Sequence, residues 1–413
     1  MDIQYKCSKL LIIKMLIKFI MEGNCQQGEI LYVDQSNFSN LQMIIDQVNL
    51  RKIIFRNGHY EIEQPIKIDK NYIEISSEND DPTDVIITNS KINGYVIILS
   101  NCHHVTIRGL TLSAKMNTSI ALTVENSNHT LVEKCRFFGG DDHFTVYYSG
   151  PKLDAGPPTL NAYDNDILNV NNIFYNNIIY SNWNGDTLAF SLQKFGKVYN
   201  NVFCGGKIAI YMVKDSEIFY NKIFDSHSHG IVVSIPSQRL VIIGNYIQSS
   251  TSSAINLMNQ IEHGPYNGII PIEGHQIVIN ANVIEDSKHI GIELTDANTV
   301  EIKQNVISNS VNGIYLHKSK SCKVYENNIK SCHIGIAIDV ESENNLVSEN
   351  KILSYYPVLT KWAIVSHLNT SDNKVTDNSF LGQYSSNAIE DFGIDNTFLN
   401  NVTGQVKNRI DNF

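Results

Sequence analysis

Charged residues are scarce in this chain, and the balance among them is acidic. They make up 18% of 413 residues, with 32 Lys and Arg against 42 Asp and Glu, and the net charge is −10. A negative protein is repelled by nucleic acid and by anionic membrane surfaces. We therefore expect no nucleic-acid partner. An acidic polysaccharide is repelled as well, unless a local basic patch or bridging cations intervene.

Paired cysteine motifs are also missing. The seven cysteines include no CxxC and no metal-ligand spacing, and their odd number leaves at least one unpaired. Scattered free thiols in apolar segments favour a reducing compartment at some stage. The cysteines are Cys7, Cys25, Cys102, Cys135, Cys204, Cys322 and Cys332.

Residues 1–27 form a separate apolar or amphipathic segment that lacks a long hydrophobic run. Its longest unbroken apolar stretch is residues 10–13, too short for a transmembrane span or an ordinary signal sequence. Lys14, Lys18 and Glu22 recur every four residues and would form a narrow polar stripe on a helix. Three interpretations stay open: a helix packed on the protein or contacting a membrane through residues 7–21, a signal or anchor, or an extension outside the fold.

An internal repeat of about 23 residues is the strongest signal in the sequence. An asparagine two residues before a branched or aromatic apolar residue marks its phase, and eight of the nine gaps between successive markers lie between 21 and 28 residues. Self-similarity at this period is typical of repeat architectures. The markers are Asn176, Asn200, Asn221, Asn245, Asn282, Asn305, Asn327, Asn350, Asn378 and Asn400.

Within each unit the apolar residues alternate with period two, and Gly, Asn and Ser separate the short runs. This pattern predicts strands of three to five residues joined by tight turns, with no helical periodicity between them. The unit is too short for a propeller blade and lacks the leucine ladder of leucine-rich repeats. Three strands per coil fit it, with coils about 4.8 Å apart and asparagine amides bonded from coil to coil. The predicted fold class is all-β, a parallel β-helix forming one domain over residues 28–413.

Residues 31–100 resemble the opening of the pectate-lyase-like right-handed parallel β-helix proteins. That family begins with a short helix, then a strand ending in a Gly-x-Tyr turn, then the first coils. Here the helix would span residues 40–49 and the turn would be Gly58-His59-Tyr60. The resemblance covers roughly residues 30–400 and implies a polysaccharide or glycan partner. The superfamily contains lyases, hydrolases and epimerases as well as non-catalytic tailspike and adhesin modules, so it does not name an activity.

Residues that a regular solenoid does not need concentrate between positions 139 and 230. Aligned on the repeat, one slot just before a strand holds Asp142, Asp186, Gly206 and His229 in successive coils, with Lys207 following Gly206. Side chains in one slot line up along the solenoid. We therefore predict a catalytic row made of Asp142, Asp186, Lys207 and His229.

Two insertions flank this row, at residues 149–170 and 258–276. Both leave the coil at the same point, so both should overhang the same side and form the walls of a groove. An aromatic outer face would bind substrate between them. The predicted substrate-binding residues are His143, Tyr147, Tyr148, Trp183 and Tyr211.

The chemistry of the row has several readings. Two carboxylates suit glycoside hydrolysis, whereas Lys207 or His229 could be the base of a lyase or epimerase that takes a proton beside a uronate carboxylate. No cofactor is required, but Asp141, Asp142 and Asp186 could hold Ca²⁺. Each residue could also be structural, because Asp before a strand often caps a turn.

A comparison with polygalacturonases does not settle the activity. Asp186 in NGDTLAF and His229 in SHGIVVS resemble two elements of that family's pattern. Lys207 stands where a twin aspartate is expected, and Glu293 lies near the position of the expected arginine. Two of the elements of the polygalacturonase pattern are missing, so we do not predict polygalacturonase activity.

Two functions therefore remain, a carbohydrate-active enzyme or a non-catalytic β-helix for display, adhesion or glycan binding. Fold analogy favours an extracellular or surface location, while the unpaired cysteines argue against it. The last residues, 397–413, show no helix to cover the end of the solenoid. Either this tail folds across the exposed edge or a second copy covers it as a homo-oligomer.

Overall fold

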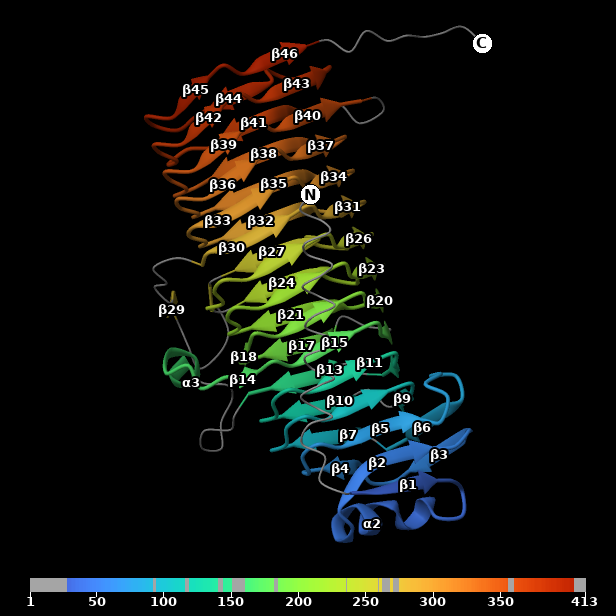
Figure 1. Ribbon diagram of the computed structural model, residues 1–413. Coiled ribbons are helices and arrows are strands. Elements are labelled where there is room, and N and C mark those ends of the chain that lie inside the picture. The colour runs from blue at the N-terminus through green and yellow to red at the C-terminus, as the bar shows by residue number, and fades with distance from the viewer. Residues whose placement is uncertain are drawn as a thin grey trace, which may run out of the picture.

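The computed structural model is a rod of stacked coils, each contributing one strand to each of three parallel sheets (Figure 1). It describes residues 28–91, 94–115, 119–139, 144–150, 160–181, 185–234, 236–258, 260–261, 268–269, 275–355 and 360–404. The chain runs from the first sheet to the second, then to the third, and then to the first again one coil further on. The prediction of an all-β, right-handed parallel β-helix is confirmed.

The first sheet has 15 described strands and faces one side of the rod. In order, these are β1 (Glu29–Val33), β2 (Leu50–Phe55), β5 (Glu74–Ser77), β8 (Thr106–Arg108), β11 (Leu131–Glu133), β15 (Ile173–Tyr175), β19 (Lys197–Tyr199), β22 (Glu217–Phe219), β25 (Val241–Ile243), β30 (Ile277–Asn280), β33 (Val300–Lys303), β36 (Lys323–Tyr325), β39 (Leu346–Ser348), β42 (Lys374–Thr376) and β45 (Thr397–Leu399).

The second sheet has 14 described strands. They are β3 (Gly58–Ile62), β6 (Val85–Asn89), β9 (Thr111–Ala114), β12 (Arg136–Phe138), β16 (Ile178–Tyr180), β20 (Val202–Cys204), β23 (Lys222–Phe224), β26 (Tyr246–Gln248), β31 (Val283–Glu285), β34 (Val306–Ser308), β37 (Asn328–Lys330), β40 (Lys351–Ser354), β43 (Ser379–Gly382) and β46 (Val402–Gly404).

The third sheet, with 13 described strands, carries the predicted row. Its strands are β4 (Ile66–Ile68), β7 (Tyr95–Ser100), β10 (Ile120–Glu125), β13 (Phe144–Ser149), β17 (Asp186–Ser191), β21 (Lys207–Tyr211), β24 (Ile231–Ser234), β27 (Ile255–Met258), β32 (Ile290–Thr295), β35 (Asn312–His317), β38 (Ile334–Asp339), β41 (Trp362–Ser366) and β44 (Ile389–Asp391).

Short elements outside the three sheets belong mostly to the insertions. From the first insertion come α3 (Leu160–Asp164) and β14 (Asn169–Val170), which pairs in parallel with β18 (Gln193–Lys194). From the second come β28 (Gln260–Ile261) and β29 (Gly268–Ile269), an antiparallel pair. In Figure 1, α3 and β29 lie on the same side of the rod.

Apolar side chains fill the interior in columns that run from coil to coil. One column in the second sheet is formed by residues that are each at most 1% exposed and paired in register. Its members are Ile284, Ile307, Ile329, Ile352 and Phe380. Each coil thus covers the apolar edge of the one before it, which is the way a solenoid stabilises units that cannot fold alone.

A buried ladder of asparagines joins the coils at the corner between the first and second sheets. After the first, Asn177, the amide oxygen of each accepts both the backbone N–H and the side-chain N–H of the asparagine one coil earlier, at 2.9–3.2 Å. The ladder residues are Asn177, Asn201, Asn221, Asn245, Asn282, Asn305, Asn327, Asn350, Asn378 and Asn401. The predicted bonding of stacked amides is confirmed.

Three of the predicted phase markers are off by one residue. Asn176, Asn200 and Asn400 have φ values near +55° and occupy the left-handed turn position, and the next residue in each case is the ladder asparagine. Asparagine tolerates this backbone conformation better than other non-glycine residues. The sequence analysis assigned one asparagine to each of these coils. In the structure, one asparagine occupies the left-handed turn and the next one forms the amide ladder.

The N-terminal end of the rod is covered by η1 (Phe38–Asn40) and α2 (Leu41–Gln47). Leu41 and Ile45 are buried on α2, and Ile44 and Val48 pack against the same core, as predicted for the capping helix. The predicted Gly58-His59-Tyr60 turn is wrong. These residues begin β3, because the Tyr60 ring is buried and its hydroxyl donates to the Arg56 carbonyl at 2.7 Å.

At the other end, the described residues show no element stacked on the last coil, formed by β44, β45 and β46. Ile394 and Val402 are 62% and 63% exposed there. Residues 1–27 and 405–413 lie outside the described residues, so the predictions of a membrane contact and of a covering tail or second copy stay predictions. Within the described part of the chain, no helix combines the length and the apolar character needed to cross a membrane.

The ladder gives the first testable prediction, for Asn305→Ala. Asn305 accepts from Asn282 and donates to the carbonyls of Ile279 and Lys303 and to the amide of Asn327, all in the interior. Removing the amide leaves several buried groups unpaired, at about 1–3 kcal/mol each. We expect a loss of about 3–5 kcal/mol in the free energy of unfolding, measured by chemical denaturation.

The matched control for this prediction is Asn387→Ala, at an exposed asparagine near the C-terminal end. A surface change of this kind is expected to stay within about 0.5 kcal/mol. Equal unfolding midpoints for the two variants would show that the ladder does not hold the coils together.

Candidate functional site

The outer face of the third sheet brings three of the predicted residues together on neighbouring strands. Asp186 begins β17 and pairs in register with Lys207, which begins β21. Lys207 Nζ lies 3.0 Å from Asp186 Oδ1, and the Tyr211 hydroxyl donates to Asp186 Oδ2 at 2.7 Å. The carboxylate is thus bonded through both oxygens, and its side chain is only 9% exposed.

The backbone at this point departs from a regular ladder. Asp186 pairs with Lys207 and Leu188 pairs with Ile208, so Thr187 is an extra residue on β17. Gly206 makes this possible, because a Cβ there would lie 1.5 Å from Thr187 Oγ1. The extra residue, a β-bulge, turns Asp186 outward toward Lys207.

Tyr211 and Tyr147 form a partly buried aromatic surface beside this ion pair. Burial raises the pKa of the Tyr211 hydroxyl well above its ordinary value, and the negative charge of Asp186 and their hydrogen bond raise it further. The pKa of Tyr147 is raised by burial and then by Glu125. Both hydroxyls therefore stay protonated at neutral pH and can donate hydrogen bonds. Tyr147 also stacks on Phe144, with ring centroids 4.6 Å apart.

His229 precedes β24 on the next coil and is a neutral base. Burial lowers the pKa of its imidazole to about 4, and the positive charge of Lys207 lowers it further, while a backbone interaction with Ser253 opposes the shift. Its Nδ1 atom is buried and has no hydrogen-bond partner. The imidazole is therefore neutral at neutral pH, and one of its two nitrogens carries a lone pair.

Phe144 begins β13 and pairs in register with Asp186. Asp142 lies outside the described residues, so its place in the row stays a prediction. Four predicted residues, Asp141, Asp142, His143 and Trp183, lie outside the described residues.

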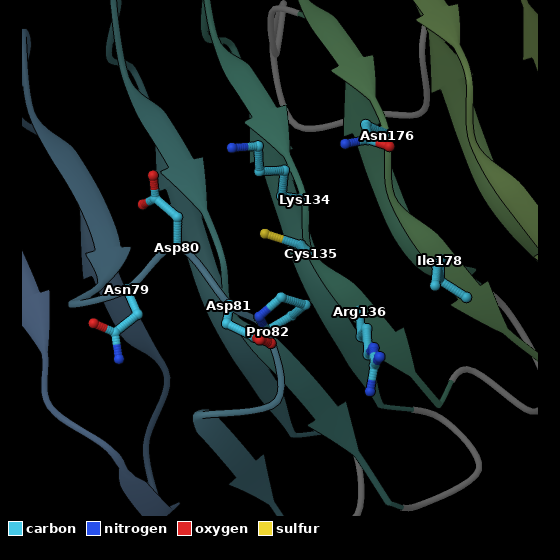
Figure 2. Close-up of a pocket in the computed structure, with 9 residues that line it drawn as sticks. All are labelled: Asn79, Asp80, Asp81, Pro82, Lys134, Cys135, Arg136, Asn176 and Ile178. Atoms are coloured by element: carbon cyan, nitrogen blue, oxygen red, sulfur yellow. The ribbon is translucent and has the colours of Figure 1, made fainter.

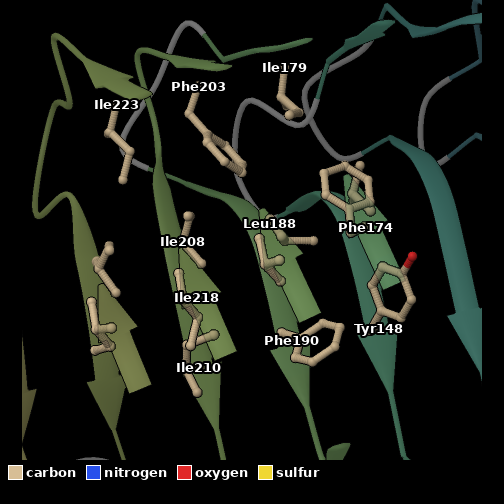
Figure 3. Packing of buried hydrophobic residues seen from close by; sticks show 14 of the residues in the cluster. Tyr148, Phe174, Ile179, Leu188, Phe190, Phe203, Ile208, Ile210, Ile218 and Ile223 are labelled. Atoms are coloured by element: carbon tan, nitrogen blue, oxygen red, sulfur yellow. The ribbon is translucent and has the colours of Figure 1, made fainter. Parts of the chain in front are cut away.

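The predicted position of Tyr148 is wrong. This residue was predicted on the outer face, but its side chain is 0% exposed and lies in the core. Figure 3 shows it among Phe174 and Phe190, and its ring centroid is 5.0 Å from that of Phe190. Alternation along β13 places Tyr147 outside and Tyr148 inside, so Tyr148 cannot contact a ligand on this face.

Sequence reasoning missed a second carboxylate on the same face. Glu293 on β32 accepts hydrogen bonds from the Ser253 hydroxyl and, at 2.9 Å, from the Asn256 amide. The only signal for it was its outward position in the strand HIGIELT. Four coils separate it from Asp186 through the register of β17, β21, β24, β27 and β32, which is about 19 Å at the usual strand spacing.

The first insertion stands at one border of this face. Tyr163 of α3 packs with Leu192 and Met212, which follow β17 and β21. Lys214 Nζ donates to the Tyr163 carbonyl at 2.7 Å and lies 3.4 Å from the Asp166 carboxylate. The described end of the insertion is therefore attached beside the Asp186 coil.

A hollow of about 380 Å³ lies elsewhere, at the corner between the first and second sheets (Figure 2). A loop carrying Asp80 and Asp81 faces Lys134 and Arg136 across it. Asp80 is held by Arg108 at 3.1 Å and Asp81 by Thr83 at 2.8 Å, so neither carboxylate is free. The candidate site is therefore sought on the third sheet, where Asp186, Lys207 and Tyr211 are in direct contact.

The predicted calcium set is not assembled in the described residues. Asp186 is bonded to a lysine and a tyrosine, and the other two aspartates lie outside the described part. Across the described ranges, no three His, Cys, Asp or Glu side chains stand close enough together to hold a metal ion. The described cysteines, Cys102, Cys135, Cys204, Cys322 and Cys332, are all unpaired.

Comparisons with known proteins agree on the architecture. Residues 250–411 match a family described as "Periplasmic copper-binding protein (NosD)". No curated protein sequence matches the chain. Among solved structures, the A-module of the Azotobacter vinelandii mannuronan C-5 epimerase AlgE6 is 10% identical, with 89% of this chain and 95% of that one covered and a TM-score of 0.58.

Two further structures have different activities on the same scaffold. The receptor-binding domain of the siphovirus 9NA tailspike is 10% identical over 92% of this chain and 77% of that one, with a TM-score of 0.64. The catalytic domain of a GH87 alpha-1,3-glucanase, solved with nigerose, is 14% identical over 92% and 69%, with a TM-score of 0.60. Identities this low indicate the fold alone. The comparisons therefore show that the chain has the right-handed parallel β-helix fold.

Proposed function

We propose that the protein acts on a uronate-containing glycan, as a lyase or epimerase, at Asp186, Lys207, Tyr211 and His229. The observation that carries this proposal is that a lysine cation and a protonated tyrosine are bound to one buried carboxylate, with a neutral histidine near the lysine on the next coil. Removal of a proton next to a carboxylate needs a base, an acid and a positive charge. These three are the groups present.

Each residue has a role in that chemistry. His229 takes the proton from the carbon beside the uronate carboxylate, and the electron pair moves into the carboxylate as an enolate that the Lys207 ammonium stabilises. Tyr211 then either protonates the departing glycosidic oxygen as the C–O bond breaks, or returns a proton to the opposite face of the carbon. The first course gives an unsaturated sugar and the second an epimer. Asp186 is a positioning residue that holds Lys207 and Tyr211.

Glycoside hydrolysis is less well supported. It requires two carboxylates about 5–9.5 Å apart, and Glu293, which lies four coils further along this face, is at least about 19 Å from Asp186. Among the described residues of the row, Asp186 therefore has no partner for that reaction.

A non-catalytic glycan-binding role is the second candidate. It is favoured by the engagement of both Asp186 oxygens, as expected for a structural ion pair. For either function we propose a location outside the cytoplasm, supported by the word "periplasmic" in the matched family's description. A polysaccharide partner is supported by the glucanase solved with nigerose and by the tailspike receptor-binding domain, which share this fold.

The enzyme proposal predicts that Asp186→Asn lowers kcat by about 100-fold or more, since Lys207 and Tyr211 lose the charge that places them. The measurement is product formation from a panel of uronate polysaccharides, scored for unsaturated ends and for epimer ratio. Asp215→Asn is the matched control, because it breaks an exposed pair with Arg239 on a turn and should leave kcat unchanged.

The unmodified protein decides between the two candidates. Binding without any product, over the full pH range and with or without Ca²⁺, would reject the enzyme and support the binding role. Release of reducing ends from a neutral α-1,3-glucan, with no activity on uronates, would reject the proton-transfer chemistry.

His229 gives a pH prediction that does not depend on a substrate. Its imidazole has a pKa of about 4 in the folded chain and 6.5 as an ordinary histidine, so between these values the unfolded chain binds a proton that the folded chain does not. The free energy of unfolding should therefore fall as pH drops from about 6.5 to about 4, by about 2–3 kcal/mol from this residue.

His229→Gln should remove this part of the pH dependence. His333→Gln, at an exposed histidine on a later coil, is the control and should keep it. The measurement is denaturant unfolding at a series of pH values. Identical pH profiles for His229→Gln and the unmodified protein would show that His229 is not held neutral by burial.

A further inference from the structure

One column of side chains on the outer face of the third sheet is buried although it points away from the core. Along β17, Leu188 and Phe190 fill the interior, so Ala189 between them points outward. The residues in register with Ala189 on the other strands point outward as well. The buried members of this column, each between 0% and 6% exposed, are Thr123, Ala189, Ala209, Val232 and Asn256.

Outward side chains of the same type on the other two sheets are not buried in this way. Val202 on β20, Val241 on β25 and Val283 on β31 are each partly exposed. Val232 has only the methyl group of Ala209 beside it on β21, yet it is 6% exposed. Neither the size of the valine nor that of its neighbour explains this difference. A further layer of protein therefore covers this part of the third sheet.

Two polar atoms of the column also need a partner. The Thr123 hydroxyl oxygen and the Asn256 amide oxygen are shielded from solvent and have no hydrogen-bond partner among the described residues. Their side chains are 1% and 3% exposed and point outward. Buried polar atoms in stable folds are nearly always hydrogen-bonded. The layer on the column therefore supplies hydrogen-bond donors as well as apolar contacts.

Residues 10–21 of this chain have the composition of such a layer. They are apolar except for Lys14 and Lys18, and on a helix Leu16 and Ile20 would lie on the side opposite the two lysines. Four lysines against one Asp and one Glu give the N-terminal segment a net charge of +2, while the rest of the chain carries −12, which gives the total of −10. Opposite net charges draw the segment toward the rod.

The N-terminal segment is also long enough to reach the column. The column ends on β27, seven strand spacings from β4, or about 34 Å. Residues 1–27 extend about 40 Å even as a continuous helix, and they lead into β1 at the same end of the rod as β4. The described part of the first insertion packs instead against Leu192 and Met212, beside the column and not on it. Residues 10–21 are therefore the segment that best matches the column.

We propose that residues 10–21 dock along the outer face of the third sheet, over Ala189, Ala209 and Val232, and compete with a glycan for that face. The docked segment covers the apolar side chains and donates hydrogen bonds to the polar atoms of the column. The competition rests on the proposed function, since Ala189 follows Asp186 on β17 and the segment covers both. A glycan binds after the segment has moved aside, which weakens its binding without abolishing it.

The test is photo-cross-linking of the full chain with benzoylphenylalanine in place of Val232. Irradiation should join this position to residues 10–21 of the same chain, as mapped by proteolysis and mass spectrometry. Val202, an outward valine on the second sheet, is the matched control and should give no cross-link to these residues. Asn256 is a second probe position, which guards against a local effect of the bulky probe. Cross-links from both probes to an insertion or to a second copy, or no cross-links, would overturn the proposal.

Variants of the segment provide a second measurement. Leu16→Asp with Ile20→Asp places charges on its apolar side and should lower the cross-link yield from Val232 at least about fivefold, whereas Lys14→Gln should keep it. The double variant should also bind a uronate polysaccharide about tenfold more tightly than the unmodified protein, because the competing segment is released.

An unchanged cross-link yield in the double variant would overturn the docking, and an unchanged glycan affinity would overturn the competition. If no glycan binds to any of these proteins, the proposed function and the competition both fail. The docking is decided separately by the cross-links, which need no ligand.

Discussion

Hydrogen bonding between coils is the constraint on which the rest of this structure depends. Each coil exposes a strand edge and a row of apolar side chains, and only the next coil can cover both. Strand pairing stops at the corner between the first and second sheets. There the asparagine ladder supplies the hydrogen bonds between neighbouring coils. Asn305 is hydrogen-bonded to an asparagine of the earlier coil and to one of the later coil, and these bonds fix how neighbouring coils align at the corner.

This rigid register is also what assembles the candidate site. Asp186 and Lys207 are 21 positions apart in the chain and come within 3.0 Å because their strands are neighbours. The extra residue at Thr187, allowed by Gly206, changes which side chains point outward. The candidate site therefore arises where one extra residue interrupts the repeat, on a sheet that is otherwise regular.

The errors in the sequence analysis share one physical cause. The period of the coils could be predicted from the sequence because stacking requires an apolar residue at the same position in every coil, as in Ile307 and Ile329. Phase within a coil was less readable, since a one-residue slip exchanges inside and outside. Tyr148 was predicted on the same face as its neighbour Tyr147, whereas adjacent residues of a strand face opposite sides, and Tyr148 is the one that is buried. Neutral His229 could not be foreseen either, because its burial and its distance from Lys207 are properties of the packed coils.

By itself the sequence determined the period, the three short strands per coil, the capping helix and the inward asparagines, because each of these follows from local alternation repeated many times. Only the tertiary structure decided that Asp186 is bound by Lys207 and Tyr211. Contacts between coils depend on the accumulated length of every turn and bulge before them. A single extra residue such as Thr187 changes these contacts without changing the repeat pattern of the sequence.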